Sequence, residues 1–193
     1  MTITLDQLKA VCKTAAGAKR AELFFPALQA AFKDPKWGLT TPRRVAYFLA
    51  QILHESGEFQ YTRELASGKA YDTRKDLGNT LKEAIAAAAA RNTTPGPFYK
   101  GAGLIQVTGY YNFKKCSQFL FNDSRLVNSP ELLCTPENAV NSALWFWVTH
   151  PSDLNKLADN DEFTLVTKAI NGGTNGFQDR LSYLRRIYRE TSK

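Results

Sequence analysis

Hydrophobic residues recur along most of this chain at the three- and four-residue spacing of amphipathic helices. The clearest helix begins after Thr41, a suitable N-cap, with Pro42 at its first position, and ends at Gly57. Apolar residues between these limits fall on one face, which would pack on the core. The same spacing predicts further helices over residues 5–16, 20–33, 79–91, 109–121, 136–149, 161–170 and 177–190.

Residues 98–108 interrupt the helical pattern. Two glycines precede the run from Leu104 to Thr108, which reads as a short strand or extended segment. The fold class is therefore mainly α, with at most a small β-hairpin. The 193 residues contain no repeat and no long linker, so we expect a single domain over 1–193, with no separate binding module.

The charge of the chain narrows its possible partners. Lys and Arg number 25 against 18 Asp and Glu, giving +7, and a basic surface favours an anionic partner. We expect no nucleic-acid binding, because the basic run at Arg185, Arg186 and Arg189 fits the solvated face of an amphipathic terminal helix. Weak association of this face with an anionic wall or lipid surface is one hypothesis, and a role in solubility alone is the equal alternative. The opposite, apolar face would consist of Phe177, Leu181, Leu184 and Tyr188.

The three cysteines and two histidines are too widely spaced to predict a disulfide framework or a metal site. We therefore expect free thiols and no cofactor. The N-terminal residues lack the apolar run of a signal peptide, and no stretch reaches about 18 uninterrupted apolar residues. These features predict synthesis in the cytoplasm.

Glu55 is the first candidate for chemistry. It follows Ile52 by three positions and Phe48 by seven, which places it on the apolar face at the end of its helix. Partial burial and the C-terminal helix dipole would both raise its pKa, as a general acid requires. A glutamate that only caps the helix or forms a salt bridge is the structural alternative.

Glu64 lies nine positions beyond Glu55, after a Ser-Gly turn. Two carboxylates facing one another are the machinery of glycoside hydrolysis, with one acting as acid and the other as base or nucleophile. Taken alone, Glu64 is better explained as a solvated surface charge. Glu58 is a nearer rival, but its position at the turn favours a surface role.

Neutral hydrogen-bonding side chains gather in two later segments. Gln106, Thr108, Tyr111 and Asn112 follow the Gly-rich stretch and suit sugar hydroxyls and acetamides. Asn171 precedes two glycines in another loop of close approach. An ordinary hairpin with buried tyrosines, and a helix C-terminus with glycine stop signals, are the structural alternatives.

These four segments together resemble glycoside hydrolase family 19, which contains chitinases and phage endolysins. The motifs are His-Glu-Ser-Gly, a second Glu nine residues later, Tyr-Lys-Gly-x-Gly-x-Ile-Gln-x-Thr-Gly-x-x-Asn, and Ile-Asn-Gly-Gly followed by Arg. Their order and spacing cover roughly residues 45–186. The short spacing between the two glutamates is similar to that of the compact members, which include endolysins. Ala102 departs from the pattern, because many members carry Arg there.

The resemblance implies a lysozyme-like helical fold with a catalytic cleft between two lobes. It implies Glu55 as general acid, Glu64 as general base and Thr108 as a holder of the attacking water in an inverting mechanism. No metal is needed. The residues that would contact or support substrate are His54, Tyr99, Gln106, Tyr111, Asn112, Asn171 and Arg180.

The catalytic motifs do not separate peptidoglycan from chitin. The basic charge, with no leader or chitin-binding module recognised, favours peptidoglycan. We therefore expect a monomeric endolysin that is made in a host cytoplasm and acts on the wall after release. A chitinase is the first alternative, and a non-catalytic wall-binding domain is the alternative from another class.

Overall fold

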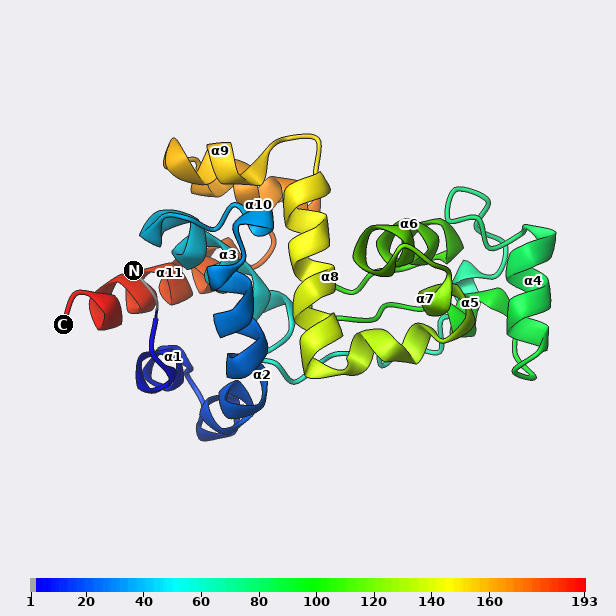
Figure 1. Ribbon diagram of the computed structural model, residues 1–193, viewed down its shortest axis with the longest axis horizontal. Coiled ribbons are helices and arrows are strands. Elements are labelled where there is room, and N and C mark those ends of the chain that lie inside the picture. Colours follow the sequence, from blue (N-terminus) through cyan, green and yellow to red (C-terminus); the bar gives the residue numbers. More distant parts are fainter. Residues whose placement is uncertain (1–2) are drawn as a thin grey trace. The chain divides into compact units, whose positions relative to one another are not determined.

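The computed structural model describes residues 3–193 and is built almost entirely of helices (Figure 1), which confirms the mainly α fold class. The chain divides into two compact units, one formed by residues up to 60 together with 146–193, and the other by 61–145. Whether the chain acts as one catalytic domain stays a prediction. The helices are α1 Leu5–Val11, α2 Ala15–Lys33, η1 Pro35–Trp37, α3 Pro42–Glu55, η2 Lys69–Tyr71, α4 Lys82–Ala89, α5 Pro95–Phe98, α6 Tyr110–Phe121, α7 Arg125–Asn128, η3 Pro130–Cys134, α8 Pro136–Thr149, α9 Leu154–Asp159, α10 Phe163–Asn171 and α11 Phe177–Thr191.

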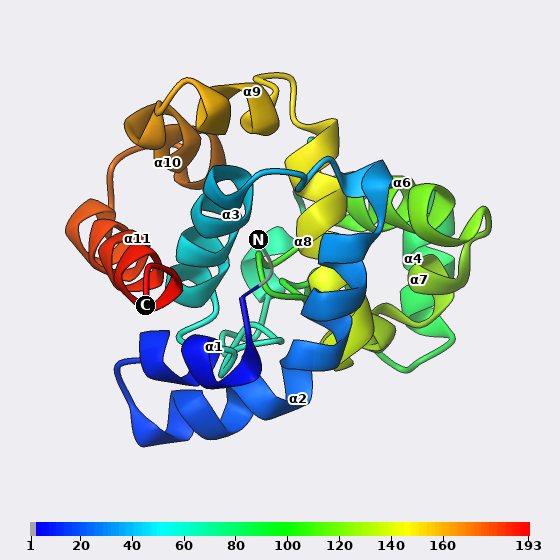
Figure 2. The ribbon, with the colours of Figure 1, turned by 60° about the vertical axis from the view of Figure 1, so that its left-hand side comes forward.

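Helix α3 is the centre of the first unit, where it packs against α9, α10 and α11 (Figure 2). Thr41 caps it by accepting a hydrogen bond from the Arg44 N–H at 3.2 Å, with Pro42 in the first turn as predicted. Every residue from Val45 to Leu53 is buried, rather than one face alone. A helix enclosed on all sides holds its last residue, Glu55, in a fixed position.

Two of the helices predicted in the first unit have different bounds in the structure. The expected helix over 5–16 ends at Val11, because Cys12 is extended with ψ 143° and Thr14 then caps α2. The Thr14 side chain accepts the Gly17 N–H at 2.9 Å. The helix expected over 161–170 begins at Phe163. A further helix, α9, precedes it and was not predicted by the hydrophobic pattern.

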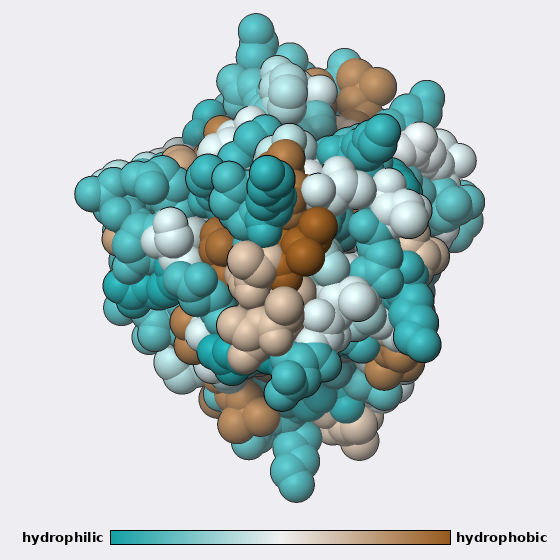
Figure 3. Space-filling view, turned by 90° about the vertical axis from the view of Figure 1, so that its right-hand side faces the viewer, coloured by the Kyte–Doolittle hydropathy of each residue, from teal (hydrophilic) through white to brown (hydrophobic). Residues whose placement is uncertain are grey.

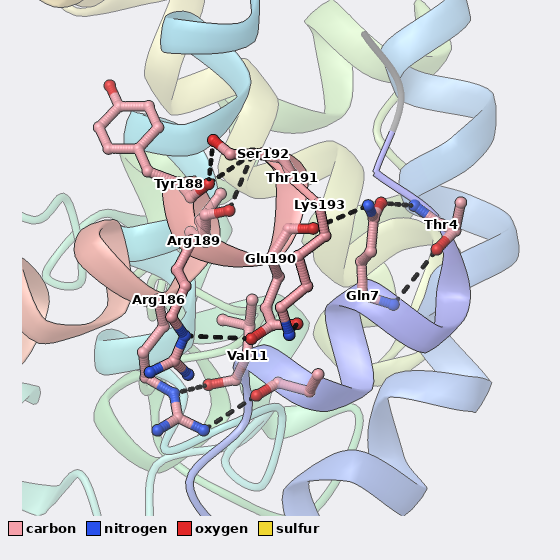
Figure 4. A network of polar contacts seen from close by, with 12 residues as sticks. Thr4, Gln7, Val11, Arg186, Tyr188, Arg189, Glu190, Thr191, Ser192 and Lys193 are labelled. Carbon is pink, nitrogen blue, oxygen red and sulfur yellow. Dashed lines mark hydrogen bonds and ion pairs between the residues drawn. The ribbon is translucent and has the colours of Figure 1, made fainter.

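The terminal helix α11 packs through a different stripe from the one predicted. Phe177 and Leu181 are only partly buried, and Tyr188 is 38% exposed. Arg186 is not a free surface charge either, because it donates to the Val11 carbonyl at 2.6 Å and thereby helps cap α1 (Figure 4). The prediction that Arg186 lies in water is wrong. The buried stripe consists of Arg180, Tyr183, Leu184, Ile187 and Glu190.

The second unit contains α4 to α7, with α4 and α6 each packing against α7. The predicted strand over 104–108 is absent, because residues 102–107 form a tight turn in which the Val107 N–H donates to the Ala102 carbonyl at 2.8 Å. Only isolated bridges, Arg63 with Ala102 and Ala102 with Val107, occur within residues 3–193. Ile85 on α4 is 49% exposed. A small apolar patch lies among hydrophilic residues on the face shown in Figure 3.

The three cysteines, Cys12, Cys116 and Cys134, are free thiols. Burial raises the pKa of the Cys12 and Cys116 thiols to about 12. Among residues 3–193, no helix has both the length and the apolar character that crossing a membrane would require. The same residues contain no group of three or more His, Cys, Asp and Glu side chains arranged to hold a metal ion.

Candidate functional site

Glu55 is held by a buried polar chain inside the first unit. Arg180 reaches from α11 and forms an ion pair with Glu55 Oε1 through Nη2. Its Nη1 donates to Gln51 Oε1 at 2.5 Å, and Gln51 Nε2 donates in turn to Thr167 Oγ1 at 3.1 Å. The Arg180 side chain is 1% exposed and that of Glu55 is 23% exposed. The chain therefore fixes the orientation of a carboxylate that solvent still reaches.

The burial of Arg180 makes this ion pair costly to break. A guanidinium removed from water requires its carboxylate partner and satisfied donors, and loss of the partner leaves an uncompensated charge. Arg180 therefore contacts the acid candidate directly, and its contribution to substrate binding stays a prediction.

His54, next to Glu55, is bound to the beginning of α11. Its Nδ1 lies 2.6 Å from Asp179 Oδ2, and Asp179 Oδ1 accepts from Lys13 Nζ at 2.5 Å. Burial opposes the charge of Asp179, but the contacts with His54 and Lys13 hold the pKa of that carboxyl below its usual range. Gly176 (φ 69°) touches the imidazole, and a Cβ there would stand 2.2 Å from the ring. His54 therefore joins α3 to α11, and a direct contact with sugar stays a prediction.

Asn171 is the last residue of α10, and Gly172 ends that helix in the left-handed conformation (φ 72°). Its Nδ2 atom is buried and has no hydrogen-bond partner among the described residues. A buried amide donor normally finds an acceptor. The Asn171 amide is therefore available to donate a hydrogen bond to a ligand oxygen or a water.

Glu64 is fixed within the second unit by the Gly-rich segment. Its Oε2 accepts the Gly101 N–H at 2.9 Å, and its own N–H donates to the Gly101 carbonyl at 2.9 Å. Tyr71 donates its hydroxyl to Glu64 Oε1 at 3.1 Å. Burial and this hydrogen bond both raise the pKa of the Tyr71 hydroxyl. Glu64 is therefore an oriented carboxylate rather than a freely solvated one.

Three of the predicted hydrogen-bonding residues form a chain in the second unit. Asn112 Nδ2 donates to the Thr108 carbonyl at 2.8 Å, and Thr108 Oγ1 donates to the Gln106 carbonyl at 2.9 Å. Gln106 has a positive φ of 56° and donates through Nε2 to the Gly103 carbonyl at 2.9 Å. Because its proton is used, the Thr108 oxygen is left as an acceptor.

The two predicted tyrosines behave differently. Tyr111 is 40% exposed, and its ring lies over Gly78, where a Cβ would come within 2.8 Å. Tyr99 is completely buried, and its hydroxyl donates to the Val127 carbonyl at 2.9 Å. A buried ring with its hydroxyl already bonded does not contact sugar. The prediction for Tyr99 is therefore corrected: it packs among Phe98, Tyr110 and Phe113 in the core of the second unit.

Comparison with known proteins decides the family. The sequence profile of the class I chitinases matches residues 19–161, a span that holds both Glu55 and Glu64. The chain belongs to glycoside hydrolase family 19. The structure of this family 19 chain is similar to that of chitinase C from Streptomyces griseus, with a TM-score of 0.71 and 20% identity over 99% of this chain and 93% of the other. That similarity supports the lysozyme-like fold alone.

Relatives from plants and bacteria match most of the family 19 chain. An endochitinase from Arabidopsis thaliana is 34% identical over 142 residues, which are 72% of this chain and 43% of the relative. A glycosyl hydrolase family 19 domain-containing protein from Haemophilus influenzae is 26% identical over 172 residues, covering 79% of this chain and 82% of the relative. The matched part thus spans less than half the length of the Arabidopsis endochitinase.

The site of this family 19 chain includes residues that sequence patterns did not reveal. Gln51 sits on α3 inside an apolar run and is 1% exposed, so an amide at that position was the available signal. Tyr71 belongs to the short helix η2, whose three residues are too few to form a hydrophobic repeat. Arg63 supports the Gly-rich segment by donating through Nη2 to the Phe98 carbonyl at 2.9 Å. Burial lowers the pKa of Arg63, and its Nη1 has no partner among the described residues.

Glu58 is buried, contrary to the surface role expected from its place at the turn. It is 3% exposed and accepts hydrogen bonds from the Thr14 and Tyr183 hydroxyls and from the Lys13 and Thr14 N–H groups. This carboxylate holds the start of α2 in the first unit. A side chain so fully engaged is structural, which removes Glu58 as a rival for the base.

Proposed function

We propose that this family 19 chain hydrolyses β-1,4 glycosidic bonds between N-acetylated amino sugars, with Glu55 as general acid and Glu64 as general base. The observation that carries the proposal is the way these carboxylates are held. Arg180 holds Glu55 within the first unit, and Gly101 with Tyr71 holds Glu64 within the second. Neither glutamate is fully buried, so both remain available for reaction.

The proposed reaction inverts the anomeric centre. Glu55 would protonate the glycosidic oxygen, while Glu64 would take a proton from a water that attacks the opposite face of the sugar. A carboxylate has about four acceptor positions, so two hydrogen bonds leave Glu64 able to bind that water. Thr108 Oγ1 would accept a hydrogen bond from the other O–H of that water, which stays on the product as its new hydroxyl, because the Thr108 proton is directed to the Gln106 carbonyl.

Binding of the N-acetyl sugars is assigned to neutral groups in the unit that carries each glutamate. Asn171 offers an unpaired amide donor in the unit that carries Glu55. Gln106, Asn112 and the exposed Tyr111 belong to the unit that carries Glu64. Such amides and aromatic rings suit acetamido groups and pyranose faces.

Peptidoglycan is the substrate that we propose first, with the chain serving as an endolysin after release from a host cytoplasm. The net charge of +7 supports this choice, because the bacterial wall is rich in carboxylates. Chitin is the second candidate, since several relatives are named endochitinases. The two polymers share the N-acetylated β-1,4 backbone that the motifs fit.

Digestion of purified peptidoglycan and of chitin oligomers, followed by mass determination of the products, tests the proposal. The expected result is cleavage of peptidoglycan into glycan fragments by the native chain and none by Glu55→Gln. Cleavage of chitin oligomers but not of peptidoglycan would indicate the chitinase alternative. Binding of either polymer without cleavage would indicate the non-catalytic wall-binding alternative.

A further inference from the structure

A hollow of about 590 Å³ opens on the surface of the first unit, at the beginning of α3. Glu55 is the last residue of the same 14-residue helix. At 1.5 Å per residue, the two lie roughly 20 Å apart. The hollow is therefore separate from the surroundings of the acid. It is lined by Thr41, Pro42, Arg43, Asp159, Asp161 and Tyr188.

Hydrogen bonds from Tyr47 and Arg44 hold the two carboxylates of the hollow in place. Tyr47, which is 1% exposed, donates its hydroxyl to Asp161 Oδ1 at 2.5 Å. Burial raises the pKa of Tyr47, so the hydroxyl keeps the proton that it donates. Asp161 also has a positive φ of 62°, an unusual conformation for a residue other than glycine. Asp159 Oδ1 accepts Arg44 Nε at 2.9 Å. Both acceptors are thus fixed before any ligand arrives.

An aromatic ring and a guanidinium complete the hollow. Tyr188 is 38% exposed on α11 and lines the hollow together with Arg43. Arg43 Nη1 also donates to the Asp159 carbonyl at 2.8 Å, which holds the guanidinium in place. The hollow therefore presents a partly exposed ring beside fixed acceptors and a donor with five N–H groups.

We propose that this hollow is an auxiliary binding site for a neutral saccharide, and specifically for a stretch of the N-acetylated glycan chain. The apolar face of a pyranose would stack on Tyr188, since C–H groups are attracted to the negative face of an aromatic ring. Its hydroxyls would donate to Asp159 and Asp161 and accept from Arg43. The identity of the glycan rests on the proposed function.

The charges of the hollow favour a neutral ligand over the other chemical classes. Asp159 is neutralised by its ion pair with Arg44, and Asp161 lies beside the guanidinium of Arg43, so the hollow has no strong net charge to attract a phosphate or another ion. A metal ion is disfavoured as well, because no triad of suitable ligands occurs among residues 3–193. Hydroxyl groups both donate and accept hydrogen bonds, so they can bind the Asp159 and Asp161 carboxylates and the neighbouring Arg43 guanidinium together.

The test is a titration of the isotope-labelled full chain, carrying Glu55→Gln so that the probe is not consumed, with the N-acetylglucosamine tetramer. Amide resonances of residues 159–161 should shift and saturate. Tyr188→Ala should weaken this binding about tenfold, as truncation of a central aromatic contact does, whereas Tyr188→Phe should retain it. Leu23→Ala, which removes another exposed apolar side chain of the same unit, is the matched control and should change nothing.

The titration separates failure of this proposal from failure of the proposed function. Shifts around Asn171 and Gln106, with none at residues 159–161, would overturn the auxiliary site and leave the proposed function intact. Shifts at 159–161 that persist unchanged in Tyr188→Ala would also overturn it. An absence of shifts everywhere would count against both.

Discussion

Replacement of Glu58 by glutamine should destabilise the first unit strongly. The Glu58 carboxylate is 3% exposed and accepts four hydrogen bonds. Two come from backbone N–H groups and one from a hydroxyl at the start of α2, and the fourth comes from the Tyr183 hydroxyl on α11. A glutamine offers one oxygen and turns an NH₂ group toward donors that need an acceptor.

The size of the effect follows from these contacts. A hydrogen bond to a charged group contributes about 1.5–3 kcal/mol, and the glutamine would lose roughly two of the four. The negative charge near the first turn of α2 is lost as well, which costs about 0.3–1 kcal/mol more. We therefore expect the free energy of unfolding to fall by about 3–7 kcal/mol. For a chain of this length, Tm should fall by roughly 6–28 °C.

The same carboxylate makes stability depend on pH. Burial opposes its charge, yet the hydrogen bonds from Thr14, Lys13 and Tyr183 outweigh burial and hold the pKa of Glu58 below its usual range. A lowered pKa in the folded state means that the stabilisation is present above the unfolded pKa of about 4.3 and is lost as the pH falls through the folded pKa. The stability difference between the native chain and Glu58→Gln should therefore narrow below about pH 4.

Urea and thermal unfolding of the two chains at pH 7 and at pH 3.5 measure both effects. Glu162→Gln, which changes an exposed glutamate of the same unit, is the matched control and should stay within about 0.5 kcal/mol of the native chain. A Glu58→Gln chain as stable as that control would refute the structural role. It would also reopen the question of whether Glu58 serves in catalysis.

Three further predictions concern other contacts. Arg186→Gln should lower the free energy of unfolding by about 1–2 kcal/mol in urea titrations, because Arg186 caps α1, whereas the exposed Arg185→Gln should not; equal effects would contradict the cap. Tyr71→Phe should lower kcat about tenfold with little change in KM, since Tyr71 orients Glu64; unchanged kcat in steady-state kinetics would exclude that role. Dithiothreitol should leave Tm unchanged in a thermal scan, because the cysteines are free thiols, and a lower Tm would reveal a disulfide.

Much of the helical framework was predictable because its signals are local. The Thr41 cap, the proline after it and the Ser-Gly stop bound α3 as expected. Residues 136–149 also match the predicted helix. Periodicity failed where a helix was short or where polar contacts replaced apolar ones. For example, α9 has six residues, too few for a repeating pattern.

The residue types of the site were predictable from the sequence, but the hydrogen-bond and ion-pair partners of these residues were not. Glu55 and Glu64 stood out through motif order and spacing, yet the contacts that hold them come from distant parts of the chain. Arg180 meets Glu55 across 125 positions, and Gly101 meets Glu64 across 37. Glu58 appeared to be a surface residue because its sequence neighbours form a turn. Its donors at Lys13 and Thr14 come from a segment more than 40 positions away, which no local pattern reveals.

The central claim, that Glu55 and Glu64 are the acid and base of an inverting glycosidase, is tested most directly by proton NMR of the first products. The native chain should release the α-anomer from a β-1,4-linked N-acetylated substrate. Glu55→Gln should be less stable, because Arg180 loses its charged partner, but the folded fraction of this chain and of Glu64→Gln should react about 10²–10⁴-fold more slowly, whereas Glu162→Gln should match the native rate. Release of the β-anomer, or native rates in a folded Glu55→Gln or Glu64→Gln chain, would contradict the claim.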